Sequence, residues 1–167
     1  MNKIILQNKK ENISLSGLYE KYSEDIFKYS FSILKDMEEA KDAVQEVFVR
    51  YAKSEDSFRN DCSYKSWLLI ITRNYCFNRI KNKNYNSEDI DGDDFNESYS
   101  PDYDMQISLK EALMKLPEEY NELIYLKEYE GFSYKEIAEI TKLSPENVKI
   151  KLFRARQELR KILKGDN

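Results

Sequence analysis

Apolar residues recur every three or four positions through most of the chain, which is the spacing of an amphipathic helix. The clearest case is 36–54, whose apolar stripe consists of Met37, Ala40, Ala43, Val44, Val47, Phe48 and Tyr51. Similar spacing predicts helices over 18–35, 67–84, 132–141 and 145–164. Helix-breaking residues are scarce, with four glycines and three prolines in 167 residues. The pattern therefore predicts an all-α fold.

The stretch 132–164 has the features of two helices joined by a tight turn. A capping box from Ser133 to Glu136 begins the first helix. Ser144 is a good N-cap for the second helix, and Pro145 fits its first position. Two helices joined in this way form a helix-turn-helix, whose second helix lies in the major groove of DNA.

The second of these helices, 145–164, is basic on the side away from its apolar stripe. From Val148 to its end it carries seven lysines and arginines against one acid. Phe153 lies on the polar side, among the cations, where it has no core of its own to join. This favours contact with DNA, and a solvated charged face is the alternative.

The helix 67–84 is apolar for two turns and then basic, with aromatic residues between the cations. Rings and cations together suit single-stranded nucleic acid, where bases stack on rings and cations follow the phosphates. The same rings could instead belong to a core, and Trp67 could anchor a three-helix bundle. The residue types alone leave both readings open.

Charge divides the chain into three parts, although its net charge is −4. Residues 1–84 are net +3, residues 85–107 hold eight acids and no base, and residues 108–167 are net +1. The middle part also lacks apolar periodicity, so it predicts a flexible acidic linker between two helical domains.

Several kinds of site find no support in the composition. With no histidine and only Cys62 and Cys76, a metal site is not expected. There is no glycine-rich phosphate loop and no catalytic Ser/His or Cys/His pair, so no cofactor and no enzymatic activity are expected. The N-terminus is too polar for a signal peptide and no apolar run could span a membrane, so we expect a cytoplasmic protein.

Three segments carry a resemblance to a known family: "DAVQEVFVRYAK"; "FRNDCSYKSWLLIITRN" with the following "NRIK"; and the stretch from "LKEALMKLPEEY" to "RARQELRKIL". They resemble the extracytoplasmic-function (ECF) sigma factors of the sigma-70 family, which are promoter-specificity subunits of bacterial RNA polymerase. The likeness covers roughly 15–83 and 108–164.

The resemblance implies a sigma region 2-like helical bundle in 1–84 and a sigma region 4-like helix-turn-helix domain in 108–167. The implied partners are core RNA polymerase, through its β′ clamp helices and β flap, promoter DNA, and a cognate anti-sigma factor that could hold the protein at a membrane without inserting it. The acidic linker could mimic nucleic acid in the polymerase channels or could simply be a solubilising tether.

The resemblance also assigns residues. Asp42, Gln45 and Glu46 would bind the β′ clamp helices. The −10 set, expected to contact the −10 element and the melted strand, is Arg59, Ser63, Tyr64, Lys65, Trp67, Arg73, Asn74 and Arg79. The −35 set, expected to contact the −35 element, is Ser144, Lys149, Ile150, Phe153, Arg154 and Arg156.

The chain departs from the family at three positions. Lys142 stands in the helix-turn-helix turn where many members have glycine, Asn78 replaces a frequent aspartate, and Ile150 replaces a small polar residue. A helix-turn-helix regulator that binds operators without polymerase is the main alternative function. A helical adaptor whose basic helix contacts an acidic protein is a third possibility.

Overall fold

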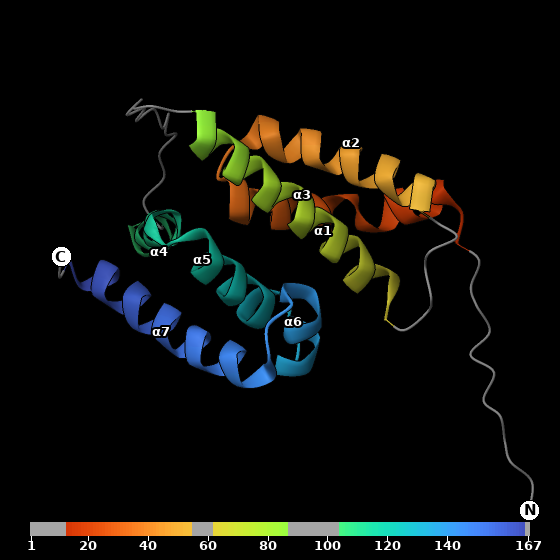
Figure 1. The fold of residues 1–167 in the computed structure, drawn as a ribbon. Coiled ribbons are helices and arrows are strands. Elements are labelled where there is room, and N and C mark those ends of the chain that lie inside the picture. The colour runs from red at the N-terminus through yellow and green to blue at the C-terminus, as the bar shows by residue number, and fades with distance from the viewer. Residues whose placement is uncertain (1–12, 55–61, 87–103, 166–167) are drawn as a thin grey trace, which may run out of the picture.

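A computed structural model describes residues 13–54, 62–86 and 104–165, and this part of the chain contains helices and no strand (Figure 1). The predicted all-α class is confirmed. The elements are α1 (Leu15–Leu34), α2 (Met37–Ser54), α3 (Tyr64–Asn86), α4 (Asp104–Lys115), α5 (Glu118–Ile124), the π-helical η3 (Tyr125–Tyr129), α6 (Tyr134–Thr141) and α7 (Pro145–Lys164). Most of the predicted linker, 87–103, lies outside the described residues.

The helices form two layers, with α1 to α3 in one and α4 to α7 in the other (Figure 1). Two helices of the first layer begin earlier than predicted. Ser14 caps α1 by accepting a 3.2 Å hydrogen bond from the Gly17 amide. Ser63 accepts one of 3.1 Å from the Ser66 amide, so α3 begins before Trp67. Both starts follow from serine hydroxyls that satisfy first-turn amides.

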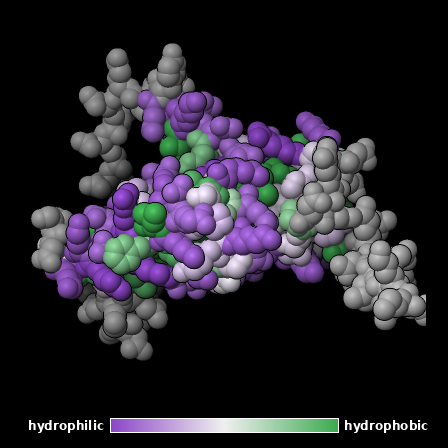
Figure 2. Space-filling model, turned by 60° about the horizontal axis from the view of Figure 1, so that its bottom comes forward, coloured by the Kyte–Doolittle hydropathy of each residue, from purple (hydrophilic) through white to green (hydrophobic). Residues whose placement is uncertain are grey.

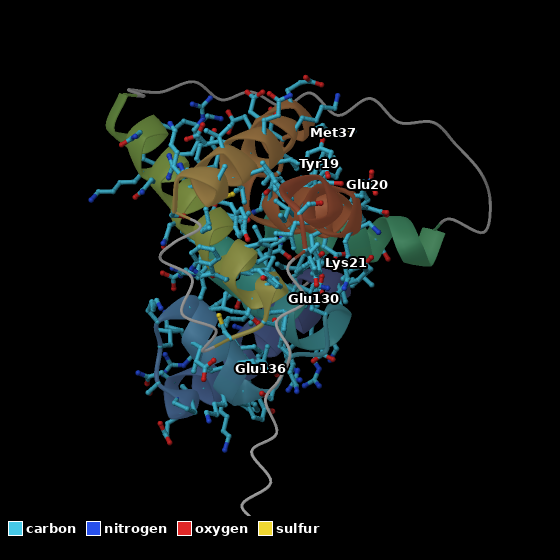
Figure 3. All side chains as sticks on the ribbon, turned by 90° about the vertical axis from the view of Figure 1, so that its right-hand side faces the viewer. Tyr19, Glu20, Lys21, Met37, Glu130 and Glu136 are labelled. Carbon is cyan, nitrogen blue, oxygen red and sulfur yellow. The ribbon has the colours of Figure 1, made fainter. Side chains whose placement is uncertain are left out.

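The stripe of α2 packs against α1 and α3 as predicted, with one exception. Ala40, Ala43, Val44, Val47, Phe48 and Tyr51 are buried. Met37 is 57% exposed, because it is the first residue of the helix and projects beyond the bundle (Figure 3). A core of its own, which includes Leu18, Ile26 and Leu68, holds the three helices together.

The helix-turn-helix forms as the capping residues predict. Ser133 Oγ accepts a 3.2 Å hydrogen bond from the Glu136 amide, and the Glu136 carboxylate accepts a 2.8 Å bond from the Ser133 amide. Ser144 caps α7 at the Asn147 amide, at 3.2 Å. Lys142 has φ 61°, the left-handed conformation that favours glycine, so the turn is strained at the position where the family often has one.

A second core joins the two layers. From the first layer it takes Tyr29, Ile33, Ala43, Leu69 and Cys76; from the second it takes Leu116, Leu123, Ile124, Leu126, Ile137, Ala138, Ile140, Val148, Leu152 and Ala155. The layers meet where α1 packs on α5 and α3 packs on α6. This direct contact between the two predicted domains is a feature that the sequence pattern did not predict.

Candidate nucleic-acid interface

The outer face of α7 combines exposed cations with exposed apolar side chains. Ile150 is 50% exposed and Phe153 is 59% exposed, with the exposed Lys149 and Arg154 beside them. The inner face of the helix buries its stripe of Val148, Leu152 and Ala155. Figure 2 looks onto the side of the molecule where α7 lies and shows isolated hydrophobic side chains among hydrophilic ones. Phe153 points away from the core, as its helical phase predicts.

Two other members of the −35 set already have structural contacts. Ser144 is the N-cap of α7. Arg156 is bonded to Glu128 of η3, with its Nε 3.0 Å from Glu128 Oε1. Lys149 remains exposed, although its Nζ lies 5.5 Å from the centre of the Tyr134 ring. The freely presented part of the set is therefore Lys149, Ile150, Phe153 and Arg154.

The cations of α3 have different surroundings. Arg73 Nε lies 2.8 Å from Glu122 Oε1 on α5. Lys65 Nζ lies 3.0 Å from Asp25 Oδ2 on α1 and 2.5 Å from Glu130 Oε2, just beyond η3. These two members of the −10 set are thus each paired with a carboxylate of the second layer.

Glu122 is the centre of a buried polar cluster. Its side chain is 1% exposed, and its Oε1 accepts hydrogen bonds from Arg73 and, at 2.5 Å, from the Tyr29 hydroxyl. Burial raises the pKa of Glu122, while Arg73 and the two hydrogen bonds favour the charged form and oppose that rise. Burial and the neighbouring Glu122 raise the pKa of Tyr29 well above its usual value, so the phenol stays a donor.

Of the remaining members of the −10 set that the structure describes, three are exposed and two pack against the core of the first layer. Ser63 and Asn74 are exposed, and the exposed Arg79 has its Nε 3.9 Å from Glu39 Oε2. Trp67 is half-buried edge-on against Tyr51, with ring centroids 5.3 Å apart. Tyr64 is also half-buried against the first core, and Arg59 lies outside the described residues. The contacts of Trp67 and Tyr64 agree with the bundle-core reading of these aromatics.

The outer face of α2 is a separate polar surface. Asp42 and Gln45 are exposed, and Glu46 is partly exposed with its Oε1 2.8 Å from Arg50 Nε. Val49 is 47% exposed at the matching helical phase and adds an apolar residue to this surface. The sequence indicates this exposure, because Val49 falls outside the apolar stripe of α2 that is buried.

Sequence reasoning missed the partners of the α3 cations. Glu122 is 49 residues from Arg73 along the chain and 93 from Tyr29. Local periodicity carries no information on such pairs. No group of residues in the described ranges could hold a metal ion, and none of the helices there is long and apolar enough to span a membrane.

Comparison with known proteins finds a family model that matches each of the two layers. The family model "Sigma-70 region 2" matches residues 18–85, and "Sigma-70, region 4" matches residues 106–159. RNA polymerase sigma factor YlaC of Bacillus subtilis (strain 168) is 32% identical, over 91% of this chain and 93% of its own. ECF RNA polymerase sigma factor SigM of the same organism is 31% identical, over 89% and 94%.

Two solved structures share the fold. The sigma factor RpoE from Bartonella quintana, solved with the anti-sigma factor NepR, aligns with a TM-score of 0.74 and 24% identity, over 91% of this chain and 98% of its own. CnrH, solved with the cytosolic domain of CnrY, aligns with a TM-score of 0.64 and 21% identity, over 92% and 89%.

The chain belongs to the sigma-70 family of RNA polymerase sigma factors. Within that family it is an ECF sigma factor, and it acts in promoter-specific initiation of transcription. The alternative of a helix-turn-helix regulator that works without polymerase is not favoured.

Proposed function

We propose that α7 recognises the −35 element with the exposed residues of its N-terminal half, Lys149, Ile150, Phe153 and Arg154. The observation that carries this is the exposure of Phe153 and Ile150 beside two cations, on the face opposite the buried stripe. An arginine can bond a guanine through two hydrogen bonds, and an apolar side chain can contact a thymine methyl. The later cations of α7 are assigned to phosphates.

We assign the −10 element and the melted strand to α3 and the residues before it. Ser63 and Asn74 offer exposed hydrogen-bonding groups there. Lys65 and Arg73 can join them once they leave their carboxylate partners. The domain limits proposed for this division of labour are 1–84, 85–107 and 108–167.

The outer face of α2 is the proposed contact with the β′ clamp helices of core polymerase. Asp42, Gln45 and Glu46 lie along one side of the helix. The exposed Val49 would bury its side chain in that contact, which supports an interface role for this face. The β flap is the second proposed contact, made by the region 4 domain.

An anti-sigma factor is the proposed regulatory partner, because the RpoE structure of similar fold is a complex with the anti-sigma factor NepR. If that partner is membrane-anchored, it would hold this chain at the membrane. The protein itself is proposed to be a cytoplasmic subunit with no catalytic activity of its own.

The test is gel filtration with core polymerase, followed by run-off transcription from genomic fragments. Asp42→Arg with Glu46→Arg should abolish co-elution, because two charges reverse on the proposed contact while the buried stripe of α2 is unchanged. The matched control is Glu20→Arg with Glu24→Arg, which makes the same charge change, with the same four-residue spacing, at exposed positions of α1. Normal co-elution of the folded test variant would remove the clamp assignment. Failure of the wild type to co-elute would remove the proposed function.

A further inference from the structure

An apolar groove of about 610 Å³ lies between α1 and the second layer, away from the residues assigned to DNA and to the β′ clamp helices. Phe27 and Phe31 line it from α1, and Leu113 and Ile124 line it from α4 and α5. Pockets for small molecules usually have volumes of about 300–1,000 Å³, mostly apolar walls and a few polar groups that fix the ligand. The groove has the size and the lining of such a site.

Two aromatic pairs give the groove flat apolar walls. The rings of Phe27 and Phe31, one turn apart on α1, are stacked with centroids 6.4 Å apart and an interplanar angle of 14°. On the other side, the rings of Tyr125 and Tyr129 are stacked at 4.9 Å and 22°. This second pair comes from η3, and π-helical turns are frequent at functional sites. An extended hydrocarbon chain can lie against rings arranged in this way.

The uncharged polar side chains that line the groove already have partners within the protein. Asn121 Nδ2 donates a 2.6 Å hydrogen bond to the Ser32 carbonyl. The Ser32 hydroxyl donates to the Tyr29 carbonyl at 2.7 Å, and the Tyr125 hydroxyl donates to Glu130 Oε1 at 3.2 Å. The inner part of the groove therefore offers a ligand mainly apolar contact.

The charged residues that line the groove leave one positive charge over. Lys28 Nζ lies 2.6 Å from Glu24 Oε1, and Glu128 Oε1 lies 3.0 Å from Arg156 Nε, so both of these charges are paired. Lys110 of α4 is exposed and forms no ion pair within the described part of the chain. Its ammonium group is thus available to an anionic group of a ligand.

We propose that this groove binds one molecule of a single-chain amphiphile with an anionic head group, such as a free fatty acid anion. The hydrocarbon chain lies between the two aromatic pairs, and the carboxylate faces the Lys110 ammonium group. Because the apolar surface is a groove and not an outer face, it fits one free chain rather than the surface of a bilayer. The proposal goes beyond the proposed function and does not depend on the assignments to promoter DNA or polymerase.

The two parts of the ligand contribute differently to binding. Each methylene group that becomes fully buried should tighten binding about fourfold. A single exposed ion pair contributes much less, about two- to fivefold. Chain length should therefore set the affinity, while Lys110 sets the preference for an anionic head group.

The experiment is a fluorescence titration of the full-length protein with cis-parinarate, a fatty acid that fluoresces more strongly in an apolar site. Decanoate, dodecanoate and tetradecanoate then displace it, all below the concentrations at which they form micelles. Binding should saturate at one molecule per chain, and the affinity should rise about fourfold for each added methylene group that the groove buries. Dodecylammonium should displace the probe less well than dodecanoate. Bound dodecanoate should also raise the melting temperature, whereas a non-specific surfactant effect would lower it.

The head group is tested with Lys110→Gln. This variant should bind dodecanoate about two- to fivefold more weakly and should bind the uncharged dodecanol as the wild type does. The matched control is Lys115→Gln, an exposed lysine of the same helix that does not line the groove. Its affinities for both ligands should equal those of the wild type.

The chain site is tested with Leu109→Gln. Leu109 lines the groove and is 43% exposed, so the change should leave the fold intact and weaken dodecanoate and dodecanol alike, by about three- to tenfold. The matched control is Leu163→Gln, at an exposed leucine of α7 that does not line the groove. Circular dichroism checks the helix content of all four variants.

Three results would overturn the proposal. Failure of every chain to bind would leave the groove to a protein segment, from a partner or from a second copy of this chain. Equal losses in Leu109→Gln and Leu163→Gln would place the ligand elsewhere. A loss in Lys110→Gln that is the same for dodecanoate and dodecanol would show that no anionic head group is recognised there. The polymerase co-elution test of the proposed function is independent of all three.

Discussion

On the two basic helices, α3 and α7, the cations proposed to contact DNA have different surroundings. On α7, Lys149 and Arg154 are exposed next to exposed apolar side chains. On α3, Lys65 and Arg73 are paired with carboxylates of the other layer. The basic content of a helix therefore does not by itself tell which cations are available to a nucleic acid; the elements packed against the helix decide that.

The number of packed faces explains the difference. The fully buried stripe of α7 is narrow, with Val148, Leu152 and Ala155, so most of the circumference stays open. Helix α3 contributes Leu68 to the core of the first layer and Leu69 to the core shared by both layers. With two sides of the helix covered, Lys65 and Arg73 fall at the edge of an interface, where they need partners.

The comparison is tested most strongly by removing one arginine from each helix. Arg73→Ala leaves Glu122 buried without its cation, and breaking a buried pair in this way costs about 3–5 kcal/mol. Arg154→Ala removes an exposed side chain and should change the free energy of unfolding by under about 0.5 kcal/mol. Urea denaturation of both variants against the wild type measures the difference. Equal small losses would mean that the Arg73–Glu122 pair is not maintained in solution.

The second prediction concerns recognition by α7. Phe153→Ala and Arg154→Ala should each cost about 1–3 kcal/mol in binding of the preferred −35 sequence and much less on scrambled sequences. The measurement is promoter binding by holoenzyme across a series of −35 substitutions. Losses that are the same for every sequence would mean that these side chains do not contact bases.

A smaller and sequence-independent effect is expected further along the same helix. Lys161 is exposed in the last turn of α7, where phosphates are the nearer partners. Lys161→Ala should weaken all sequences alike and lower the slope of log affinity against log salt by about one. The same holoenzyme titration at several salt concentrations measures it. A loss confined to one promoter sequence would assign Lys161 to a base.

What the sequence could predict is local. The helix-turn-helix, its caps at Ser133 and Ser144 and the outward position of Phe153 all follow from residues within a few positions of one another. The contact between Glu122 and Tyr29 could not be predicted in this way, because no pattern links positions 93 residues apart. The prediction of two domains on a flexible tether therefore missed that they share a core.

The exposure of Met37 shows the limit of periodicity even within one helix. Its phase matches the buried stripe of α2, yet the stripe continues only as far as the neighbouring helices reach. The aromatics of α3 show the same limit in the other direction. The residue types of α3 allowed the interpretation that Trp67 stacks on nucleic-acid bases. In the structure its ring packs on Tyr51 within the bundle.

The smallest expected effect concerns the two thiols, and it tests whether the buried side of α3 stays covered. Burial raises the pKa of Cys76 to about 12, so at pH 8 only about one thiol in 10⁴ is the reactive thiolate. Cys62 is half-buried before the start of α3. Iodoacetamide should therefore modify Cys62 and spare Cys76 in the native protein, as mass spectrometry can measure, and should modify both in urea. Because the thiolate fraction of Cys76 stays small up to pH 9, raising the pH should not remove its protection. Modification of both cysteines at similar rates in the native chain would show that α3 often leaves its core. The covered α3 would then be one of several populated states, and its difference from the exposed α7 would hold for only a fraction of the molecules.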